Sequence, residues 1–294
     1  GTVHANSNVS VRVAPGTIHG VIGENGAGKS TLMSVVYGYY QADSGEIRVN
    51  GEAINIKSPQ HAISHGIGMV HQHFMLVDTF TVLENIVLGA ENGRLLAPSL
   101  ATARDELERL ERDYNLEVDP EAIVGALPVG VQQRVEILKA LYRGADILIL
   151  DEPTGVLTPQ EVDHLFRILA ALREQGKTII LITHKLREIM ALTDEVTVMR
   201  GGEVITQVKT AETTREDLAA MMVGRTVLLR VAKGDAHPGE ALLEVESLSV
   251  VDRTGITRVK DVSFSMRAGE ILGIAGVAGN GQSELLEALA GIFP

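Results

Sequence analysis

Short apolar runs alternate along this chain with segments in which apolar residues recur at helical spacing. The runs predict strands, and those from Ile147 onward are apolar on both faces, which is typical of buried strands. The predicted strands are Ile18–Ile22, Ile67–Val70, Ile147–Leu150, Ile179–Ile182 and Val196–Met199. We also expect a short β region near Glu46–Ile56 and a mostly helical stretch from Val82 to Tyr142. Alternating strands and helices predict an α/β fold with a parallel sheet.

The segment at residues 9–38 reappears in similar form at residues 262–291. The first copy is VSVRVAPGTIHGVIGENGAGKSTLMSVVYG and the second is VSFSMRAGEILGIAGVAGNGQSELLEALAG. Both have a strand–glycine loop–helix pattern, so we expect two copies of one domain. The second copy is too short to bury an independent core. We therefore predict a first domain over residues 1–225, a linker over 226–240 and the N-terminal part of a second domain over 241–294.

Composition narrows the class of protein further. Of the 294 residues, 45% are hydrophobic and 22% are charged, which is typical of a globular protein. The absence of cysteine excludes disulfides, iron–sulfur clusters, thiolate zinc sites and cysteine nucleophiles. The longest apolar run, Leu218–Val223, is far shorter than the ~20 residues of a membrane span. A net charge of −12 argues against duplex nucleic acid as a partner, so we expect an acidic cytosolic protein.

A candidate phosphate-binding loop follows the first predicted strand. It matches G-x-x-x-x-G-K-[ST] between a strand and a helix, which is the context that this motif needs. Its residues are Gly23, Glu24, Asn25, Gly26, Ala27, Gly28, Lys29, Ser30 and Thr31. The glycines let successive N–H groups point at phosphate oxygens. Lys29 supplies a cation for the β- and γ-phosphates, and the Ser30 hydroxyl is suited to bind magnesium.

Two acids follow the predicted strand Ile147–Leu150. In a parallel sheet, the carboxyl ends of the strands meet at the ligand crevice. Asp151 can therefore reach a magnesium ion, and Glu152 can polarise a water aimed at the γ-phosphate. The alternative is that Asp-Glu-Pro-Thr only ends a strand and caps the next helix. The phosphate loop alone does not distinguish among kinases, GTPases, helicases and transport ATPases.

The order of further motifs is more specific. After GENGAGKST come Gln72 in VHQHF, then LPVGVQQRVEILKAL, ILILDEPT and LITH, which ends at His184. This order, over essentially the whole chain, resembles the ATP-binding subunit of ABC transporters. The closest likeness is to the importers of simple sugars and nucleosides, whose ATPase fuses two nucleotide-binding domains. The resemblance implies a P-loop NTPase (RecA-like) fold with a small antiparallel β subdomain and a helical subdomain.

The resemblance also implies roles for particular residues. It assigns Gln72 to a lid that links magnesium to the membrane-facing surface, and Asp151 to magnesium itself. Glu152 would be the catalytic base, and His184 would contact the γ-phosphate. The implied signature segment comprises Leu127, Pro128, Val129, Gly130, Val131 and Gln132. The implied cofactors are ATP and Mg²⁺.

Three departures from the family pattern bear on these roles. The signature usually has serine where this chain has Pro128, which offers neither a hydroxyl nor an N–H. The second phosphate loop has Gln282 where the first has Lys29. No aromatic residue precedes the first loop, where such domains stack adenine, and we expect Gly1 to lie just downstream of that position. The second loop comprises Gly276, Gly279, Gly281, Gln282 and Ser283.

The first two departures fall in one composite site if two domains pack head to tail, as they do in this family. The signature that contains Pro128 would then face the loop that contains Gln282. We therefore expect one hydrolytic site at Lys29, completed by the signature of the second domain, and one degenerate site.

These inferences predict the ATP-hydrolysing subunit of an importer for a nucleoside or a simple sugar. The implied partners are two membrane permeases and an extracytoplasmic solute-binding protein, with no nucleic acid. The subunit would lie at the cytoplasmic face of the membrane, held there by the permeases, and the full-length chain would form a pseudo-dimer from its own two domains. The alternatives are a soluble ABC ATPase that acts on ribosomes or DNA, and a module that binds nucleotide without hydrolysis, which Glu152 disfavours.

Overall fold

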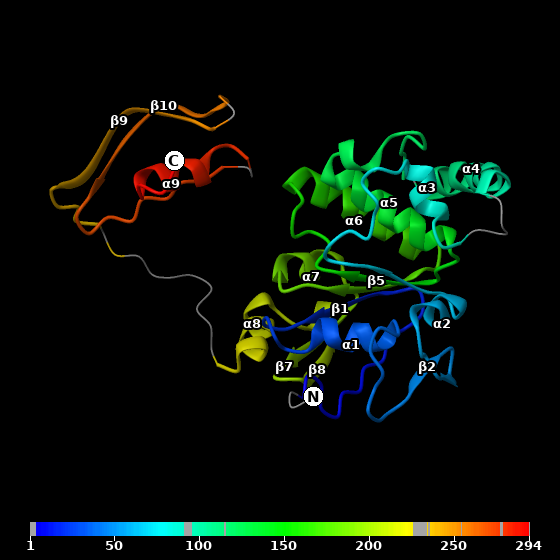
Figure 1. Ribbon diagram of the computed structural model, residues 1–294. Helices are drawn as coiled ribbons and strands as arrows, with labels where there is room; N and C mark the ends of the chain where they lie inside the picture. The colour runs from blue at the N-terminus through cyan, green and yellow to red at the C-terminus, as the bar shows by residue number, and fades with distance from the viewer. Residues whose placement is uncertain are drawn as a thin grey trace. The chain divides into compact units, whose positions relative to one another are not determined.

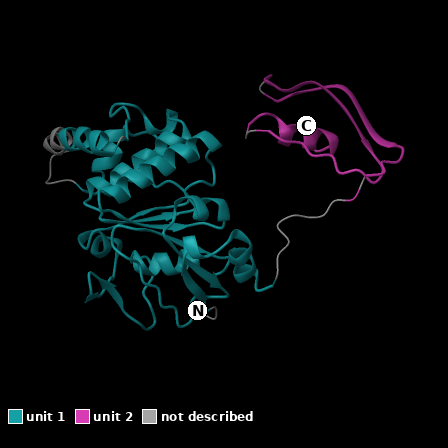
Figure 2. Ribbon diagram, turned by 180° about the vertical axis from the view of Figure 1, so that it is seen from behind, with its two compact units in different colours: residues 1–229 teal, residues 230–294 magenta. Residues whose placement is uncertain are grey.

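The computed structural model of the chain describes residues 4–90, 96–114, 116–225, 234, 236–253, 255–276 and 279–293. The chain forms two compact units, residues 1–229 and 230–294, which Figure 2 shows in different colours. Most of the expected linker, namely residues 226–233 and 235, lies outside the described residues.

Unit 1 is built on a six-stranded sheet with the strand order β4-β5-β6-β1-β7-β8. Its strands are β1 (Ile18–Ile22), β4 (Ile67–Val70), β5 (Ile147–Asp151), β6 (Thr178–Ile182), β7 (Glu195–Arg200) and β8 (Glu203–Lys209). The first five in this order are parallel, so the predicted parallel sheet is confirmed. Strand β8 was not predicted, and it pairs antiparallel with β7. Positive φ angles at Gly201 and Gly202 allow the tight turn that joins β7 to β8.

Helices cover both faces of this sheet (Figure 1). On one face lie α3 (Val82–Val87), α4 (Leu96–Tyr114), η1 (Val124–Ala126), α5 (Val129–Tyr142) and α6 (Pro159–Glu174). On the other lie α1 (Lys29–Val36), α2 (Pro59–Ser64) and an antiparallel pair formed by β2 (Ile47–Val49) and β3 (Glu52–Ile54). The chain continues through α7 (Leu186–Leu192), η2 (Thr210–Glu212) and α8 (Arg215–Val223). The expected small antiparallel β region and helical stretch are thus confirmed.

Two of these helices start at capping boxes that the sequence encodes locally. The Thr81 hydroxyl accepts the Glu84 N–H while the Glu84 carboxylate accepts the Thr81 N–H, which begins α3. Thr158 and Glu161 make the same reciprocal pair at the start of α6, where Pro159 occupies the first helical position. Each pair satisfies two backbone donors that a helix start leaves without partners.

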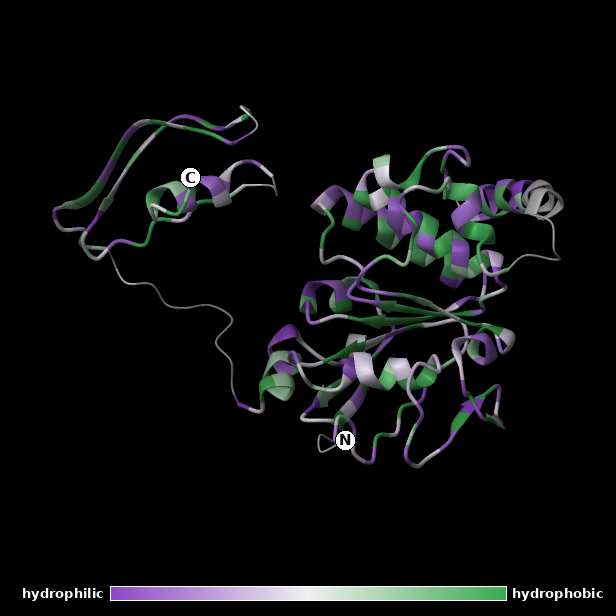
Figure 3. Cartoon of the chain, in the orientation of Figure 1, coloured by the Kyte–Doolittle hydropathy of each residue, from purple (hydrophilic) through white to green (hydrophobic). Residues whose placement is uncertain are grey.

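The core lies between the sheet and its two helical layers. Along β5, Leu148 and Leu150 pack into the cluster beneath α5 and α6, whereas Ile149 packs into the cluster that contains Met33 of α1. Alternate residues of a strand point to opposite faces, so a strand covered on both sides must be apolar throughout. Figure 3 shows the hydrophobic residues gathered on the strands and on the helix sides that face them.

Unit 2 consists of a hairpin and a helix. Strands β9 (Ala241–Val251) and β10 (Thr257–Arg267) pair antiparallel, and α9 (Gln282–Leu289) contributes Leu285 to a small core with Val250 and Val259. The repeat predicts a strand equivalent to β1 before α9, but residues 270–276 form no strand, and Ile271 is 98% exposed. The reason is pairing. β1 is hydrogen-bonded between β6 and β7, and the described part of unit 2 has no equivalent of either strand.

Across the described residues, every helix is too short or too polar to cross a membrane.

Candidate nucleotide-binding site

The phosphate loop joins the end of β1 to the start of α1, and two of its positions require glycine. A side chain at Gly23 would overlap the carbonyl oxygen of Met199. Gly28 has a φ of +95°, and a side chain there would overlap the backbone oxygen of Ala5. The Asn6 amide donates a hydrogen bond to the Gly28 carbonyl (3.1 Å). The N-terminal segment thus packs directly against the loop.

Lys29 is folded back into this loop. Its Nζ donates to the carbonyl oxygens of Gly23 (2.8 Å) and Glu24 (3.1 Å), and the residue is only 6% exposed. Burial lowers the pKa of Lys29, while the nearby charges of Glu152 and Asp151 raise it. The loop therefore holds an ammonium group at its centre, where a phosphate would meet it.

Asp151 is the last residue of β5 and lies next to the loop. The Ser30 hydroxyl donates to its Oδ1 at 3.2 Å. Burial raises the pKa of the Asp151 carboxyl, the Ser30 hydrogen bond lowers it, and the Glu152 charge raises it. A hydroxyl and a carboxylate side by side are hard oxygen ligands of the kind that Mg²⁺ prefers.

The described residues contain no group of three or more His, Cys, Asp or Glu side chains that could hold a metal. Magnesium usually takes one or two protein oxygens and completes its shell with phosphates and water. The oxygens of Ser30 and Asp151 could serve as such ligands in this chain.

Glu152 and His184 form a contact at the same edge of the sheet. His184 follows β6 by two residues, and its Nδ1 lies 2.8 Å from Oε1 of Glu152. The His184 side chain is 46% exposed and that of Glu152 is 16% exposed, so the pair faces solvent from a partly covered position. Glu152 has a φ of +49°, a conformation that non-glycine residues seldom adopt and that is common at active sites.

Gln72 and the signature segment are carried by other elements of unit 1. Gln72 follows β4 by two residues and is exposed. Pro128 is the N-cap of α5, and the Gln132 amide donates to the carbonyl oxygen of Leu127 (2.9 Å). In the described part of the chain, neither Gln72 nor the signature segment shares a hydrogen bond with the phosphate loop.

The second loop has a similar local arrangement. Gly281 is the N-cap of α9 with a φ of +90°, and Gly279 also has a positive φ. The Gln282 amide packs against Gly276, so it extends back over its loop as Lys29 does over the first. Residues 277 and 278 lie outside the described residues. The second loop therefore presents a neutral amide where the first presents a cation.

Sequence reasoning missed several buried polar residues behind these groups. The Gln133 amide donates to the Pro153 carbonyl oxygen (2.7 Å) and so joins α5 to the loop after β5. Glu188 of α7 contacts hydroxyls from two loops. Gln133 lies one helical turn before the buried Ile137, and Glu188 precedes the buried Ile189. A polar residue on an apolar helix face is the signal that could have found them.

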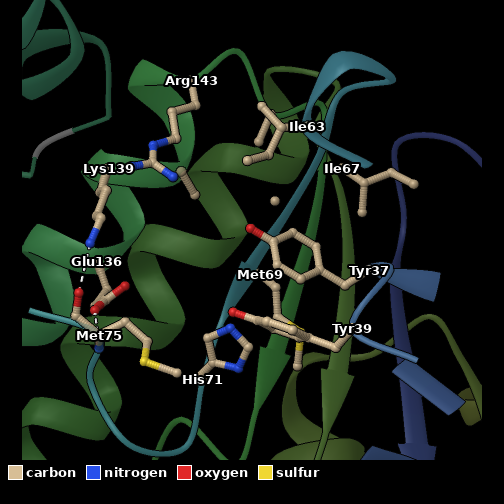
Figure 4. Close-up of a pocket in the computed structure, with 13 residues that line it drawn as sticks. Tyr37, Tyr39, Ile63, Ile67, Met69, His71, Met75, Glu136, Lys139 and Arg143 are labelled. Atoms are coloured by element: carbon tan, nitrogen blue, oxygen red, sulfur yellow. Dashed lines mark hydrogen bonds between the residues drawn. The ribbon is translucent and has the colours of Figure 1, made fainter. Parts of the chain in front are cut away.

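A cavity of about 100 Å³ lies between α5, β4 and the segment after α1, and His71, the residue before Gln72, lines it (Figure 4). The rings of Tyr37, Tyr39 and His71 gather on one side of it, with Tyr39 and His71 centroids 5.4 Å apart. On the other side, Lys139 Nζ donates to the Met75 carbonyl oxygen at 2.7 Å. The Glu136 carboxylate accepts the Met75 N–H. These contacts fix the loop that carries Gln72 onto α5.

Burial shifts the titration of the groups around this cavity. Burial raises the pKa of Glu136, while the nearby Lys139 charge acts in the opposite direction. It lowers the pKa of Lys139 against the opposing Glu136 charge. It also lowers the pKa of His71, and the Lys139 charge lowers it further. The neutral form of His71 is therefore favoured beside the two tyrosines.

A mixed sheet with a phosphate loop after β1 and an acidic pair at the end of β5 defines a phosphate-loop nucleotide-binding fold. The family model described as ABC transporter matches residues 6–155. That match covers half of the chain, and the chain belongs to the ABC transporter family.

Three curated relatives are similar over nearly the whole chain. The chain is 50% identical to the nucleoside import ATP-binding protein NupA of Lactococcus lactis subsp. cremoris and 53% identical to the guanosine import ATP-binding protein NupO of Bacillus subtilis. It is 47% identical to the glucose import ATP-binding protein TsgD13 of Haloferax volcanii. The alignments cover 98%, 98% and 99% of this chain and 57%, 56% and 58% of those proteins. The chain thus spans somewhat more than half the length of these relatives.

Solved structures of ATP-binding cassettes have the same fold. A nucleotide-free cassette from an ABC transporter aligns with a TM-score of 0.64 and 26% identity, covering 76% of this chain and 90% of that one. The ADP conformation of MJ1267, an ATP-binding cassette of an ABC transporter, aligns with a TM-score of 0.63 and 26% identity, covering 74% of this chain and 89% of that one. The predicted cassette fold is therefore confirmed.

Proposed function

We propose that this chain binds and hydrolyses ATP as the nucleotide-binding subunit of an importer. The observation that carries the proposal is the arrangement of Lys29, Ser30 and Asp151 at one end of β1 and β5, with Glu152 and His184 in contact beside them. Family membership and the similarity to import proteins support it. The similarity to import ATP-binding proteins favours this function over the alternative of an ATPase that acts on ribosomes or DNA.

The chemistry follows from the side chains. Lys29 can leave the carbonyl oxygens of Gly23 and Glu24 and donate to the β- and γ-phosphates instead. Ser30 and Asp151 would hold Mg²⁺, which neutralises phosphate charge when it is bound. The Glu152 carboxylate can accept a proton from the attacking water.

His184 would orient that base. A carboxylate oxygen can only accept, so the hydrogen of the 2.8 Å contact lies on His184 Nδ1. The other ring nitrogen, Nε2, is then an acceptor for a hydrogen of the attacking water in the neutral ring, and a donor to the γ-phosphate only in the protonated ring. The contact also limits the positions of the Glu152 side chain, and placement of a catalytic group contributes strongly to rate.

The two composite sites would differ. We propose that the Lys29 site is hydrolytic and that the site formed by Gln282 and the Pro128 signature is degenerate. Gln282 lacks the cation and Pro128 lacks the hydroxyl that would interact with phosphate. In this proposal, residues 1–225 are a nucleotide-binding domain and residues 241–294 begin a second, degenerate one. The two domains would form a pseudo-dimer in the full-length chain.

The permeases would contact the surface beside Gln72. Tyr39 and Met75 are 49% and 55% exposed at the rim of the cavity described above, and exposed apolar groups around a hollow are typical of interaction surfaces. A contact there would place the subunit at the cytoplasmic face of the membrane. We further propose a nucleoside or a simple sugar as the solute, delivered by an extracytoplasmic binding protein.

Reconstitution tests this function. The natural chain would be assembled with its permeases in vesicles, and uptake of labelled guanosine and glucose would be measured with and without MgATP. We expect ATP-dependent uptake of one solute class and its loss in Lys29→Ala. Equal uptake by the parent and Lys29→Ala would contradict the proposal.

A further inference from the structure

A buried carboxylate joins the two loops that carry Glu152 and His184. Glu188 lies in α7 and is only 4% exposed. Its Oε1 accepts a hydrogen bond from the Thr154 hydroxyl, and its Oε2 accepts one from the Thr183 hydroxyl at 3.0 Å. Thr154 comes two residues after Glu152, and Thr183 immediately precedes His184. One side chain thus holds both loops, one with each oxygen.

Lys185 completes this cluster and balances its charge. Its Nζ donates to the carbonyl oxygen and to the hydroxyl of Thr154, both at 3.0 Å, and lies 3.5 Å from Oε1 of Glu188. Its backbone N–H donates to the Thr183 hydroxyl, also at 3.0 Å. A buried carboxylate that has a cation and two hydroxyl donors is satisfied, and such networks fix one arrangement of the chain.

An ordinary helix-capping role does not account for Glu188. It is the third residue of α7, where a capping-box glutamate would accept the N–H of the N-cap residue, Lys185. That N–H goes instead to Thr183, and both carboxylate oxygens face the loop hydroxyls. The side chain therefore connects α7 to the site rather than closing its own helix.

The connection matters because the Glu152 conformation is strained. Glu152 has a φ of +49°, and its N–H donates to the Ile182 carbonyl oxygen at 2.9 Å. A strained residue persists only where surrounding contacts hold it. Since Thr154 lies on the Glu152 side and Thr183 on the His184 side, the Glu188 bridge sets the separation of the two loops.

We propose that Glu188 is a positioning residue, which holds Glu152 and His184 in contact for hydrolysis. This inference rests on the hydrolytic function proposed above. Glu188 does not touch the nucleotide loop itself, so its loss should lower turnover and leave nucleotide affinity unchanged.

The test uses four single variants and one triple variant of the natural chain assembled with its permeases. Glu188→Ala removes the bridge, whereas Thr154→Val and Thr183→Val each remove one hydroxyl at nearly constant volume. Glu174→Gln, on the exposed end of α6, is the matched control for loss of a carboxylate. We expect kcat to fall about 10- to 100-fold in the first three, with KM for MgATP within about two-fold of the parent. Adding both valines to Glu188→Ala should cause little further loss, because the three act as one unit.

A second readout separates this inference from the proposed function. The ¹⁵N and ¹H signals of the His184 imidazole report its contact with Glu152 without any turnover. These signals should shift in Glu188→Ala and Thr183→Val and stay unchanged in Glu174→Gln. If the parent hydrolyses no ATP but His184 still responds to Glu188, the proposed function fails and the positioning role stands.

Other outcomes overturn the inference. Unchanged kcat and unchanged His184 signals in well-folded variants would show that the bridge positions nothing. Losses of kcat that only match the loss of folded protein, measured by thermal unfolding, would show a purely structural role. If Glu188→Ala does not fold, the two valine variants decide, because each keeps the carboxylate in place.

Discussion

Asn85 anchors the loop that leads from Gln72 to α3, and its replacement by alanine should be costly. Asn85 is fully buried in α3. Its Oδ1 accepts the Val77 N–H at 2.7 Å, and its Nδ2 donates to the carbonyl oxygens of Val77 and Thr81, both at 3.0 Å. Asn85→Ala removes all three hydrogen bonds from a loop that otherwise has no regular structure.

The loss of stability in Asn85→Ala depends on which backbone groups keep another hydrogen-bond partner. The Val77 carbonyl still accepts from Phe80 N, and the Thr81 carbonyl still accepts from Asn85 N. Only the Val77 N–H loses its partner, and Val77 is half-buried, so water can reach it in part. Two net hydrogen bonds at about 1 kcal/mol each, plus the low end of the cost of an orphaned donor, give a destabilisation of about 3 kcal/mol.

Urea unfolding followed by circular dichroism measures this loss in the transition of unit 1. Gln160→Ala, which removes an exposed amide from α6, is the control and should change stability by about 0.5 kcal/mol or less. Hydrogen exchange at the Val77 amide should accelerate in Asn85→Ala. A destabilisation equal to that of the control, with unchanged exchange at Val77, would refute the reasoning.

Two further predictions concern charge. Lys29→Ala should weaken MgATP binding by about ten-fold or more, since a charge-assisted contact is lost. Gln282→Ala should change binding and hydrolysis far less. Equal losses for the two variants, in calorimetry and in phosphate release, would contradict the assignment of a single hydrolytic site. Burial lowers the pKa of His19, opposed by Glu195, so the folded chain holds this imidazole neutral while the unfolded chain protonates it near 6.5. The free energy of unfolding should therefore fall as the pH drops through about 6.5, and less steeply in His19→Gln; parallel stability curves for the two proteins would contradict this.

Local sequence patterns predicted the sheet of unit 1 well. The predicted bounds of β1 and β4 equal those of the structure, because both strands are continuous runs of buried residues. Strand β8 escaped prediction, since its mixed residues lie at a sheet edge and depend on pairing with β7. The strand expected at residues 270–276 is absent because a strand also depends on pairing. This segment has apolar side chains, but the described part of unit 2 has no strand next to it.

The site divides in a similar way. The phosphate loop and the acidic pair occupy short contiguous segments, so their spacing alone indicates their chemistry. The 2.8 Å contact of Glu152 with His184 and the bridge through Glu188 join separate loops, and only the order β5-β6 in the sheet brings these loops together. A single glutamate in a helix has no sequence signal for such a role beyond its apolar neighbours.

We propose that Glu152 is the base of a hydrolytic site at Lys29. The most direct test measures phosphate release and nucleotide affinity for the natural chain with its permeases, beside Glu152→Gln. Glutamine keeps the shape of the side chain but cannot accept the proton from water. We expect near-parental MgATP affinity and a rate that is ~10²- to 10⁴-fold lower. Hydrolysis by Glu152→Gln at the parental rate would contradict it.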